Sequence, residues 1–393
     1  MAEPSAAAIP AKPARDHRLD FFRGLALVFI FIDHIPNNAL SHFTLRAFAF
    51  SDAAEVFIFI SGYTAALVYG RAMQREGALM GTARIWRRVW QLYVAHLCLF
   101  LIYNAEVAYT MVHFNNPLFA DELQVGAFLN EPGTTLIHVL LLEFQPSLLN
   151  ILPLYISLLL IFPLILLALR RHVLLALLPS AALYLAVQLW GLNLPGYPEG
   201  AHWYFDPFAY QFLFTLAAAF GLAQVQGATI LPPWRGWMVL AIAVAAIGAA
   251  MQLPATLHDM LPAVPALPRV PYWANDKSAL SPLRVLNVLA LAYLVARLVP
   301  RDAAFIRSRA GWLLVICGQN SLYVFCLTIL LSVLGNIAYS LAGDALLVQL
   351  AINMIGLATM LALGLLLAWF NAGGRLPRPP APAAKGVEGS DGA

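Results

Sequence analysis

Long apolar stretches dominate this sequence and constrain its fold more than any other feature. A run of roughly twenty mostly apolar residues is the length that a helix needs to cross about 30 Å of hydrocarbon. A helix pairs its backbone groups internally, whereas an isolated strand in lipid leaves them unpaired. The sequence therefore predicts an all-α, polytopic integral membrane helix bundle with about ten transmembrane helices. The predicted spans are residues 20–36, 53–70, 89–112, 149–169, 173–190, 207–226, 237–252, 283–299, 311–334 and 342–370.

The composition agrees with a chain whose main solvent is lipid. Of the 393 residues, 61% are hydrophobic and 11% are charged, whereas an ordinary soluble domain has about 25% charged residues. The net charge of +3 is too small to favour nucleic-acid binding. The cysteines Cys98, Cys317 and Cys326 lie within apolar runs, so no disulfide framework is indicated. No spacing of metal-ligating residues predicts a metal site either.

The two ends of the chain differ in composition from its central part. Residues 1–14 and 371–393 are rich in Ala, Pro and Gly, and we expect them to be disordered cytoplasmic tails. Residues 15–370 then form one transmembrane domain. In the long connection 113–148, the segment Thr134–Leu142 is too short to span, and we expect a re-entrant or interfacial helix there.

The distribution of basic residues predicts the orientation of the chain. Cytoplasmic connections of membrane proteins carry the excess of Lys and Arg. With the N-terminus inside, nineteen of the 23 basic residues fall on the cytoplasmic side. An even number of spans then places both termini in the cytoplasm. The basic residues left on the outer side are Arg46, Arg269, Lys277 and Arg284.

Ionisable residues within the predicted spans point to the position of a functional site. Such groups cost a few kcal/mol each in lipid, so they usually face the bundle interior and mark a site. Here they are concentrated in the first three spans, which therefore hold the predicted site. The residues concerned are Arg23, Asp33, His34, Glu55, His96 and Glu106.

Arg23 and His34 are spaced so that one helix face carries both. Eleven residues at 100° each return to nearly the same face, and at 1.5 Å per residue they are separated by roughly 16 Å. A ligand with an anionic head and a long arm ending in a reactive group, such as acyl-coenzyme A, suits this arrangement. Alternatively, Arg23 is a positive-inside anchor, and His34 is a histidine that bonds a carbonyl at a helix end.

Several carboxylates are candidates to orient the His34 imidazole. Asp33 is adjacent in sequence, so on a helix its side chain diverges from that of His34 by about 100°. Glu55 lies at a similar depth and is able to fix the tautomer of a general base. However, Asp52 and Glu55 also have the spacing of a capping box. Glu106 is the reserve candidate, with an interfacial carboxylate as the alternative.

Two further groups of residues have the chemistry of ligand binding. Arg84, Arg87 and Arg88 recur at helical spacing before the third span and suit a phosphate, although a positive-inside cluster accounts for them equally well. In the outer connections, aromatic side chains such as Trp203 suit sugar rings, whereas an aromatic belt explains them without a ligand.

The sequence resembles a known family in several segments that occur in the same order. The stretch Arg15–Ala72, which includes "RLDFFRGLALVFIFIDHIPNN", is similar to the start of the OpgC family of membrane proteins, which succinylate osmoregulated periplasmic glucans. The Arg23-x10-His34 pattern also resembles that of the wider membrane acyltransferase-3 group. Two positions depart from the OpgC pattern, because Asn150 stands where Asp is expected and Asp206 where Asn is expected. Further similar segments are "RVWQLYVAHL", "FLNEP", "ILPLYISLLLIFP", "NLPGYPEG", "PLRVLNVLALAYL" and "GQNSLYVFCL".

The resemblance implies a multi-pass O-acyltransferase of the bacterial inner membrane, more specifically an O-succinyltransferase. Succinyl-coenzyme A would be a co-substrate on the cytoplasmic side rather than a tightly bound cofactor, and a glucan would be the acceptor on the periplasmic side. His34 would act as general base, and Asp33 or Glu55 would orient it. A homo-oligomer is compatible with the sequence, and the alternative function is a transporter or flippase for a polar solute or acylated carbohydrate. The remaining assignments are Arg23, Arg84, Arg87, Arg88, Asn320 and Tyr323 for the donor, and Trp203, Glu106 and Lys277 for the acceptor.

Overall fold

The computed structural model describes residues 15–114, 121–228, 234–261, 263, 265, 271–343 and 345–379. In this part of the chain all regular elements are helices, apart from one isolated β-bridge between Pro195 and His202, which confirms the all-α prediction. The predicted tail 1–14 and most of the tail 371–393 lie outside the described residues. The helices are α1 (His17–Asp33), η1 (Ala39–Phe43), η2 (Leu45–Ala47), α2 (Ala53–Glu76), α3 (Ala78–Phe114), α5 (Gly126–Asn130), α6 (Pro132–Leu140), α7 (Ile151–Arg171), α8 (Val173–Trp190), α9 (Pro207–Gln226), α10 (Arg235–Met260), η3 (Tyr272–Asn275), α11 (Pro282–Leu298), α12 (Ala304–Arg307), α13 (Arg309–Gln319), α14 (Ser321–Ala342) and α15 (Leu346–Asn371).

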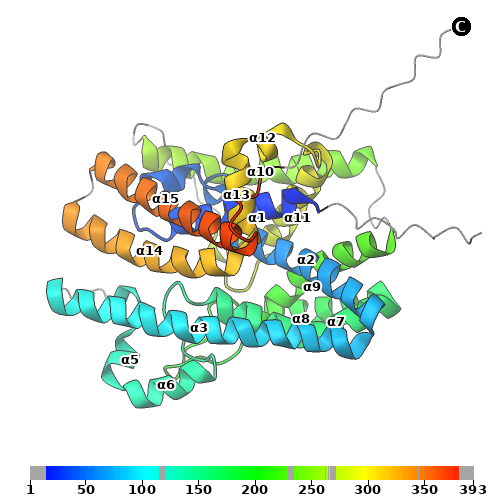
Figure 1. Cartoon of the computed structure of the whole chain (residues 1–393), viewed down its shortest axis with the longest axis horizontal. Coiled ribbons are helices and arrows are strands. Elements are labelled where there is room, and N and C mark those ends of the chain that lie inside the picture. Colours follow the sequence, from blue (N-terminus) through cyan, green and yellow to red (C-terminus); the bar gives the residue numbers. More distant parts are fainter. Residues whose placement is uncertain are drawn as a thin grey trace, which may run out of the picture.

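Most of the helices run lengthwise through the molecule, as expected for a membrane bundle (Figure 1). In the described part of the chain, eight helices are long and apolar enough to cross a membrane. The helices α1 and α11 have 17 residues each, which is the lower limit of a spanning length. The count of ten spans and the cytoplasmic position of both termini stay predictions. The eight helices are α2, α3, α7, α8, α9, α10, α14 and α15.

Each predicted span overlaps a helix, but the ninth was wrongly predicted as one continuous segment. Residues 311–334 are divided between α13 and α14, which meet at Asn320. The side-chain amide of Asn320 donates to the carbonyl of Ile316 at 3.0 Å. Asn and Ser side chains compete with the backbone for hydrogen bonds, which favours helix ends at such residues. The chain therefore changes direction in the middle of this apolar run.

The connection after α3 contains the short helix that was predicted there. This helix, α6, begins at Pro132 and ends at Leu140, close to the predicted Thr134–Leu142. It lies with α5 beside the long helix α3 (Figure 1). The tyrosine hydroxyl of Tyr93 donates to the carbonyl of Leu140 at 2.9 Å, so α6 is joined directly to α3.

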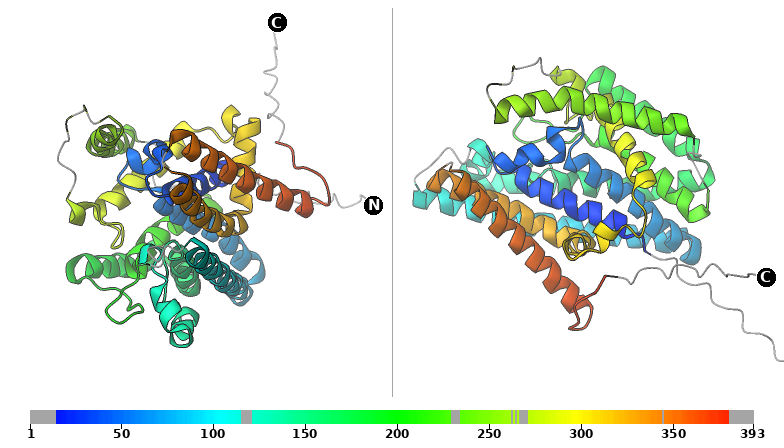
Figure 2. Two further views of the ribbon diagram at one scale, coloured as in Figure 1. Left: turned by 90° about the vertical axis from the view of Figure 1, so that its left-hand side faces the viewer. Right: turned by 90° about the horizontal axis from the view of Figure 1, so that it is seen from above.

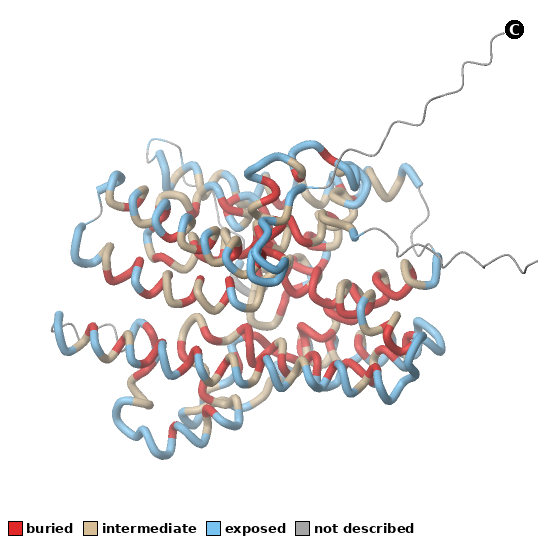
Figure 3. The backbone as a smooth tube through the Cα atoms, in the orientation of Figure 1, coloured by how far each residue is buried: buried red, intermediate tan, exposed pale blue. Residues whose placement is uncertain are grey.

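The central helices α1 and α2 approach their neighbours closely because glycine lies at the contacts. A Cβ atom added at Gly24 of α1 would lie 2.0 Å from the carbonyl oxygen of Leu314 in α13. At Gly62 of α2 it would lie 2.5 Å from the carbonyl oxygen of Phe214 in α9. Gly62 therefore allows α2 and α9 to pack closely. Buried residues follow these contacts through the middle of the bundle (Figure 3).

Several chain segments meet around one cavity in the bundle. The bundle is seen along its helices in Figure 2, left. The last turn of α1 and the first turns of α2 and α7 meet there with residues of the connections before α7, α9 and α11. In the predicted orientation these turns and connections belong to the outer side of the bundle.

Candidate functional site

A polar cavity of about 320 Å³ lies where these segments meet. Its wall combines residues that are far apart in the sequence, from His34 at the end of α1 to Phe325 in α14. Both signs of charge are present, so the cavity suits a polar ligand with a reactive group rather than a purely apolar one. The polar lining residues are Asp33, His34, Arg46, Asp52, Gln124, Ser147, Asn150, Tyr204 and Lys277.

His34 is positioned by the end of α1. It is the C-cap residue, and its backbone N–H donates to the carbonyl of Ile30 at 3.1 Å. The ring nitrogen Nδ1 is buried and has no hydrogen-bond partner among the described residues. A buried polar atom without a partner is costly in a folded protein and is found mainly where a ligand, water or reaction uses it. The imidazole therefore has free hydrogen-bonding capacity at the cavity wall.

Asp33 points to a different set of partners from His34. Its Oδ1 accepts a hydrogen bond from the hydroxyl of Thr44 at 2.7 Å. The same oxygen lies 3.7 Å from Nε of Arg46. The divergence predicted for adjacent helical side chains is thus seen, and none of the described hydrogen bonds joins Asp33 to His34.

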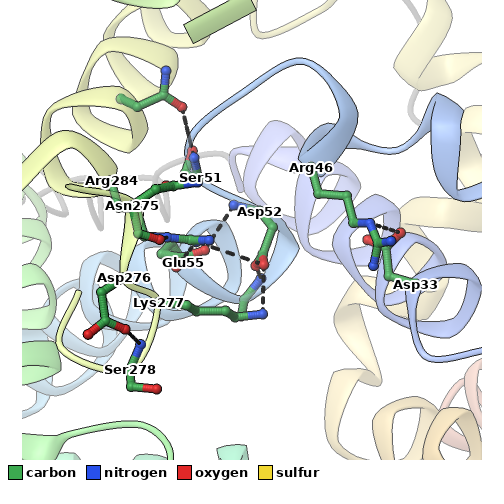
Figure 4. Close-up of polar contacts among 12 residues, drawn as sticks. Asp33, Arg46, Ser51, Asp52, Glu55, Asn275, Asp276, Lys277, Ser278 and Arg284 are labelled. Carbon is green, nitrogen blue, oxygen red and sulfur yellow. Dashed lines mark hydrogen bonds and ion pairs between the residues drawn. The ribbon is translucent and has the colours of Figure 1, made fainter. Parts of the chain in front are cut away.

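Glu55 is held in a buried ion-pair network behind the cavity (Figure 4). It completes the capping box of α2, because its Oε2 accepts from the backbone N–H of Asp52 at 2.9 Å. Its Oε1 lies 2.6 Å from Nη1 of Arg284 and accepts from the hydroxyl of Tyr210 at 3.2 Å. The capping interpretation is confirmed. None of the described hydrogen bonds joins Glu55 to His34.

Asp52 and Lys277 extend this network into the cavity. Nζ of Lys277 lies 2.6 Å from Oδ2 of Asp52, and the Lys277 ammonium stands over the ring of Phe205. Burial opposes the charged form of Asp52, but Lys277 and Arg284 outweigh it and hold its pKa below the ordinary value. Burial likewise opposes the charged form of Lys277, but Asp52 and Glu55 raise its pKa overall. Both side chains therefore stay charged at neutral pH.

The comparison with protein families identifies the chain. The family model described as OpgC protein matches residues 15–372, nearly the whole chain. The chain belongs to the OpgC family. Membership indicates a membrane transferase with a role in the modification of osmoregulated periplasmic glucans. Searches of curated proteins and of solved structures gave no match.

Three of the residues predicted from the sequence line the cavity of this OpgC-family chain. They are His34, Asp33 and Lys277. Trp203 and Glu106 do not line it, although Nε1 of Trp203 and Oε1 of Glu106 are both buried with no partner in the described part of the chain. Acceptor binding by these two residues stays a prediction.

The residues predicted to bind the donor lie elsewhere in the bundle. Nη2 of Arg23 donates to the hydroxyl of Thr64 at 2.6 Å, which ties α1 to α2. Further along the chain, Arg84 forms an ion pair with Glu76 at 2.7 Å. Binding of a donor by this group is a prediction that the described contacts leave open. In the remaining set, Arg87 and Tyr323 are exposed, Arg88 donates to Gln91 and Asn320 joins α13 to α14.

The sequence reasoning missed Arg46, Asp52 and Arg284 as parts of a site. Asp52 was considered only as a helix cap, and the two arginines only as outer charges. The sequence nevertheless contained a signal for the two arginines, because basic residues are scarce on the predicted outer side and those present there are candidates for a site. Among the described residues, no group of three or more His, Cys, Asp or Glu side chains is arranged to hold a metal ion.

Asp206, one of the two departures from the OpgC pattern, is the buried N-cap of α9. Its Oδ1 accepts from the backbone N–H of Phe208 at 2.8 Å. Burial raises the pKa of Asp206 to about 6, although hydrogen bonds from Phe208 and Ala209 partly oppose this. The folded state therefore binds a proton more tightly than the unfolded state. Stability from this group is greatest below about pH 4 and falls as the pH rises to about 6.

We expect Asp206→Asn to remove this pH dependence. Asn is a good N-cap and carries no charge, so the variant should be more stable than the parent above pH 6 by on the order of 2 kcal/mol. Unfolding temperatures of both proteins in detergent, at pH 5 and pH 8, give the measurement. An equal difference at the two pH values would contradict the role assigned to the Asp206 carboxyl.

Proposed function

We propose that this chain is an O-acyltransferase of the bacterial inner membrane. It would transfer an acyl group, succinyl in this proposal, from a coenzyme A thioester to a hydroxyl of a periplasmic glucan. The observation that carries the proposal is His34, whose Nδ1 is buried at the wall of a polar cavity and has no hydrogen-bond partner among the residues that the structure describes. Family membership supplies the glucan as the acceptor class.

The proposed reaction is a direct transfer with His34 as general base. The imidazole accepts the proton of the sugar hydroxyl while the hydroxyl oxygen attacks the thioester carbonyl. The C–S bond breaks, the ester forms, and the coenzyme A thiolate takes up the proton from the imidazolium. No G-x-S-x-G elbow is present in the sequence, which favours direct transfer over an acyl-enzyme.

The surrounding charges support this step in distinct ways. Asp33 lies next to His34 in the cavity wall and offers negative charge to the transient imidazolium. Glu55 acts less directly, since it fixes the start of α2 and holds Arg284. Arg23 and the Arg84, Arg87 and Arg88 cluster are proposed to bind the phosphates of the donor at the predicted cytoplasmic end.

Mass spectrometry of periplasmic glucans tests the proposal. Glucans from cells that carry the gene are expected to show succinyl mass increments, and glucans from cells that lack it are expected to show none. Identical spectra would contradict acyl transfer. Loss of the glucans themselves from the periplasm, with no change in substitution, would instead support the transporter alternative.

A further inference from the structure

Basic residues from the predicted outer side gather around the cavity. Positive charge is disfavoured in outer connections, and only four of the 23 basic residues are assigned there. Arg46 and Lys277 line the cavity, and Arg284 lies directly behind it. The fourth, Arg269, lies outside the described residues. Because these residues meet around one cavity, we interpret their positive charges as part of the site rather than as determinants of membrane orientation.

Two of these cations are already engaged by close carboxylates (Figure 4). Lys277 lies 2.6 Å from Asp52, and Arg284 lies 2.6 Å from Glu55. Nε of Arg284 also donates to the carbonyl of Asn275 at 3.2 Å. Their charges are therefore matched within the protein.

Arg46 differs from both because its guanidinium makes no hydrogen bond among the described contacts. Its closest carboxylate oxygen, Oδ1 of Asp33, is 3.7 Å from Nε, which is beyond hydrogen-bonding distance. That oxygen already accepts the hydroxyl of Thr44 at 2.7 Å. The Arg46 side chain is 52% exposed and lines the same cavity as His34. Its donors are thus available to a ligand that reaches His34.

The chemistry of these donors selects a particular kind of ligand. A guanidinium presents its N–H groups as a planar fork that matches a carboxylate in two parallel hydrogen bonds. A neutral acyl group, such as acetyl, has no group that can use this fork. An acyl group with a second, free carboxylate can place that carboxylate on Arg46 while its thioester carbonyl lies near His34.

We propose that Arg46 forms an anion subsite that binds the free carboxylate of a dicarboxylic acyl group during its transfer. The inference rests on the proposed succinyl transfer and adds the residue that selects the acyl group. The incoming carboxylate takes Arg46 from its loose pair with Asp33, and Thr44 keeps Asp33 in place. In this arrangement Arg46 selects the acyl group, and His34 carries out the proton transfer.

A competing explanation is that Arg46 contacts the glucan. Arg46 also lines a neighbouring polar cavity of about 280 Å³, together with Ser41, His42, Gln252, Thr256 and Asn275 among others. The two explanations predict different results. A contact with the acceptor affects transfer from every donor equally, whereas a contact with the free carboxylate affects dicarboxylic donors only.

The test compares two donors on the full-length protein, purified in detergent, with one unsubstituted glucan as acceptor. For the parent, Arg46→Gln and Arg46→Lys, kcat/KM is measured with succinyl-coenzyme A and with acetyl-coenzyme A. Arg46→Gln should lower the succinyl-to-acetyl ratio about tenfold or more, mainly through KM for the succinyl donor. Arg46→Lys should keep part of the parent's preference for the succinyl donor, because lysine retains the positive charge but lacks the planar N–H donors of the guanidinium.

Controls separate this inference from folding and from the proposed function. An inactive fraction of the protein does not change the succinyl-to-acetyl ratio of kcat/KM, because both donors are measured with the same preparation. Arg171→Gln, at the exposed end of α7, should leave the ratio unchanged. Acetyl-coenzyme A is also tested as a competitive inhibitor of succinyl transfer. This gives its affinity for the protein even where acetyl transfer is too slow to measure.

The outcomes are distinct. An unchanged ratio in Arg46→Gln, whether both donors fall together or neither changes, would overturn the anion subsite while leaving acyl transfer intact. A parent protein that transfers neither acyl group would instead contradict the proposed function.

Discussion

Replacement of His34 by glutamine is expected to lower the rate of glucan acylation by about 10²- to 10⁴-fold, the range that a general base contributes. Glutamine has a similar reach and keeps a hydrogen-bonding group at the cavity wall, but it cannot take up a proton. The cavity and the end of α1 should therefore persist while proton removal from the sugar hydroxyl fails. The measurement is kcat for succinyl transfer by the purified protein, compared with the parent at saturating donor.

His113→Gln provides the matched control for this experiment. His113 is exposed at the end of α3, and its Nδ1 contacts only the carbonyl of Tyr109 among the described hydrogen bonds. This variant should transfer acyl groups at the parent rate. Monodisperse elution of both variants in detergent excludes misfolding as the cause of any loss. If His34→Gln retained activity within a few fold of the parent, His34 would not be the base.

The second large effect concerns stability and is expected for Glu55→Gln. Glutamine can still complete the capping box, so this change isolates the charge of Glu55, whose side chain is fully buried. The variant leaves Arg284 without its closest counter-charge. Breaking a buried ion pair in this way typically costs about 3 to 5 kcal/mol. Thermal unfolding in detergent should show a correspondingly large decrease in unfolding temperature.

A more exposed ion pair of similar length gives the comparison. Arg84 and Glu76 lie 2.7 Å apart, with side chains 55% and 35% exposed, and Glu76→Gln should cost about 0 to 1 kcal/mol. The double variant Glu55→Gln, Arg284→Gln should recover much of the loss, because it leaves no unmatched buried arginine. Equal small effects at Glu55 and Glu76 would show that burial does not control the strength of the Glu55–Arg284 pair.

The helices could be predicted from the sequence because the length of an apolar run is a local property of the chain. Every predicted span overlaps a helix, and the short helix α6 lies where the sequence placed it. The break at Asn320 was missed because the polar residues Gln319, Asn320 and Ser321 interrupt a long apolar run only briefly. Hydropathy averaged over a whole span is insensitive to so short an interruption, although such side chains favour a helix end there.

Only part of the candidate site could be predicted from the sequence. His34 and Asp33 were found because ionisable groups are rare in apolar helices, and Lys277 was proposed as a ligand contact. The partner of Glu55 was not found, since Arg284 lies 229 residues further along the chain. No local pattern encodes a contact of that separation.

The all-α class of this protein and its apolar runs could be predicted from residue type and spacing, because both are local properties of the chain. The pairing of its charges could not, because it depends on contacts between separate elements. The packed helices bring Arg284 to Glu55 and Lys277 to Asp52, and among the described residues the closest carboxylate oxygen to Arg46 is 3.7 Å away. Ion pairing depends on distances of a few ångströms between separate elements, and those distances are set by how the helices pack.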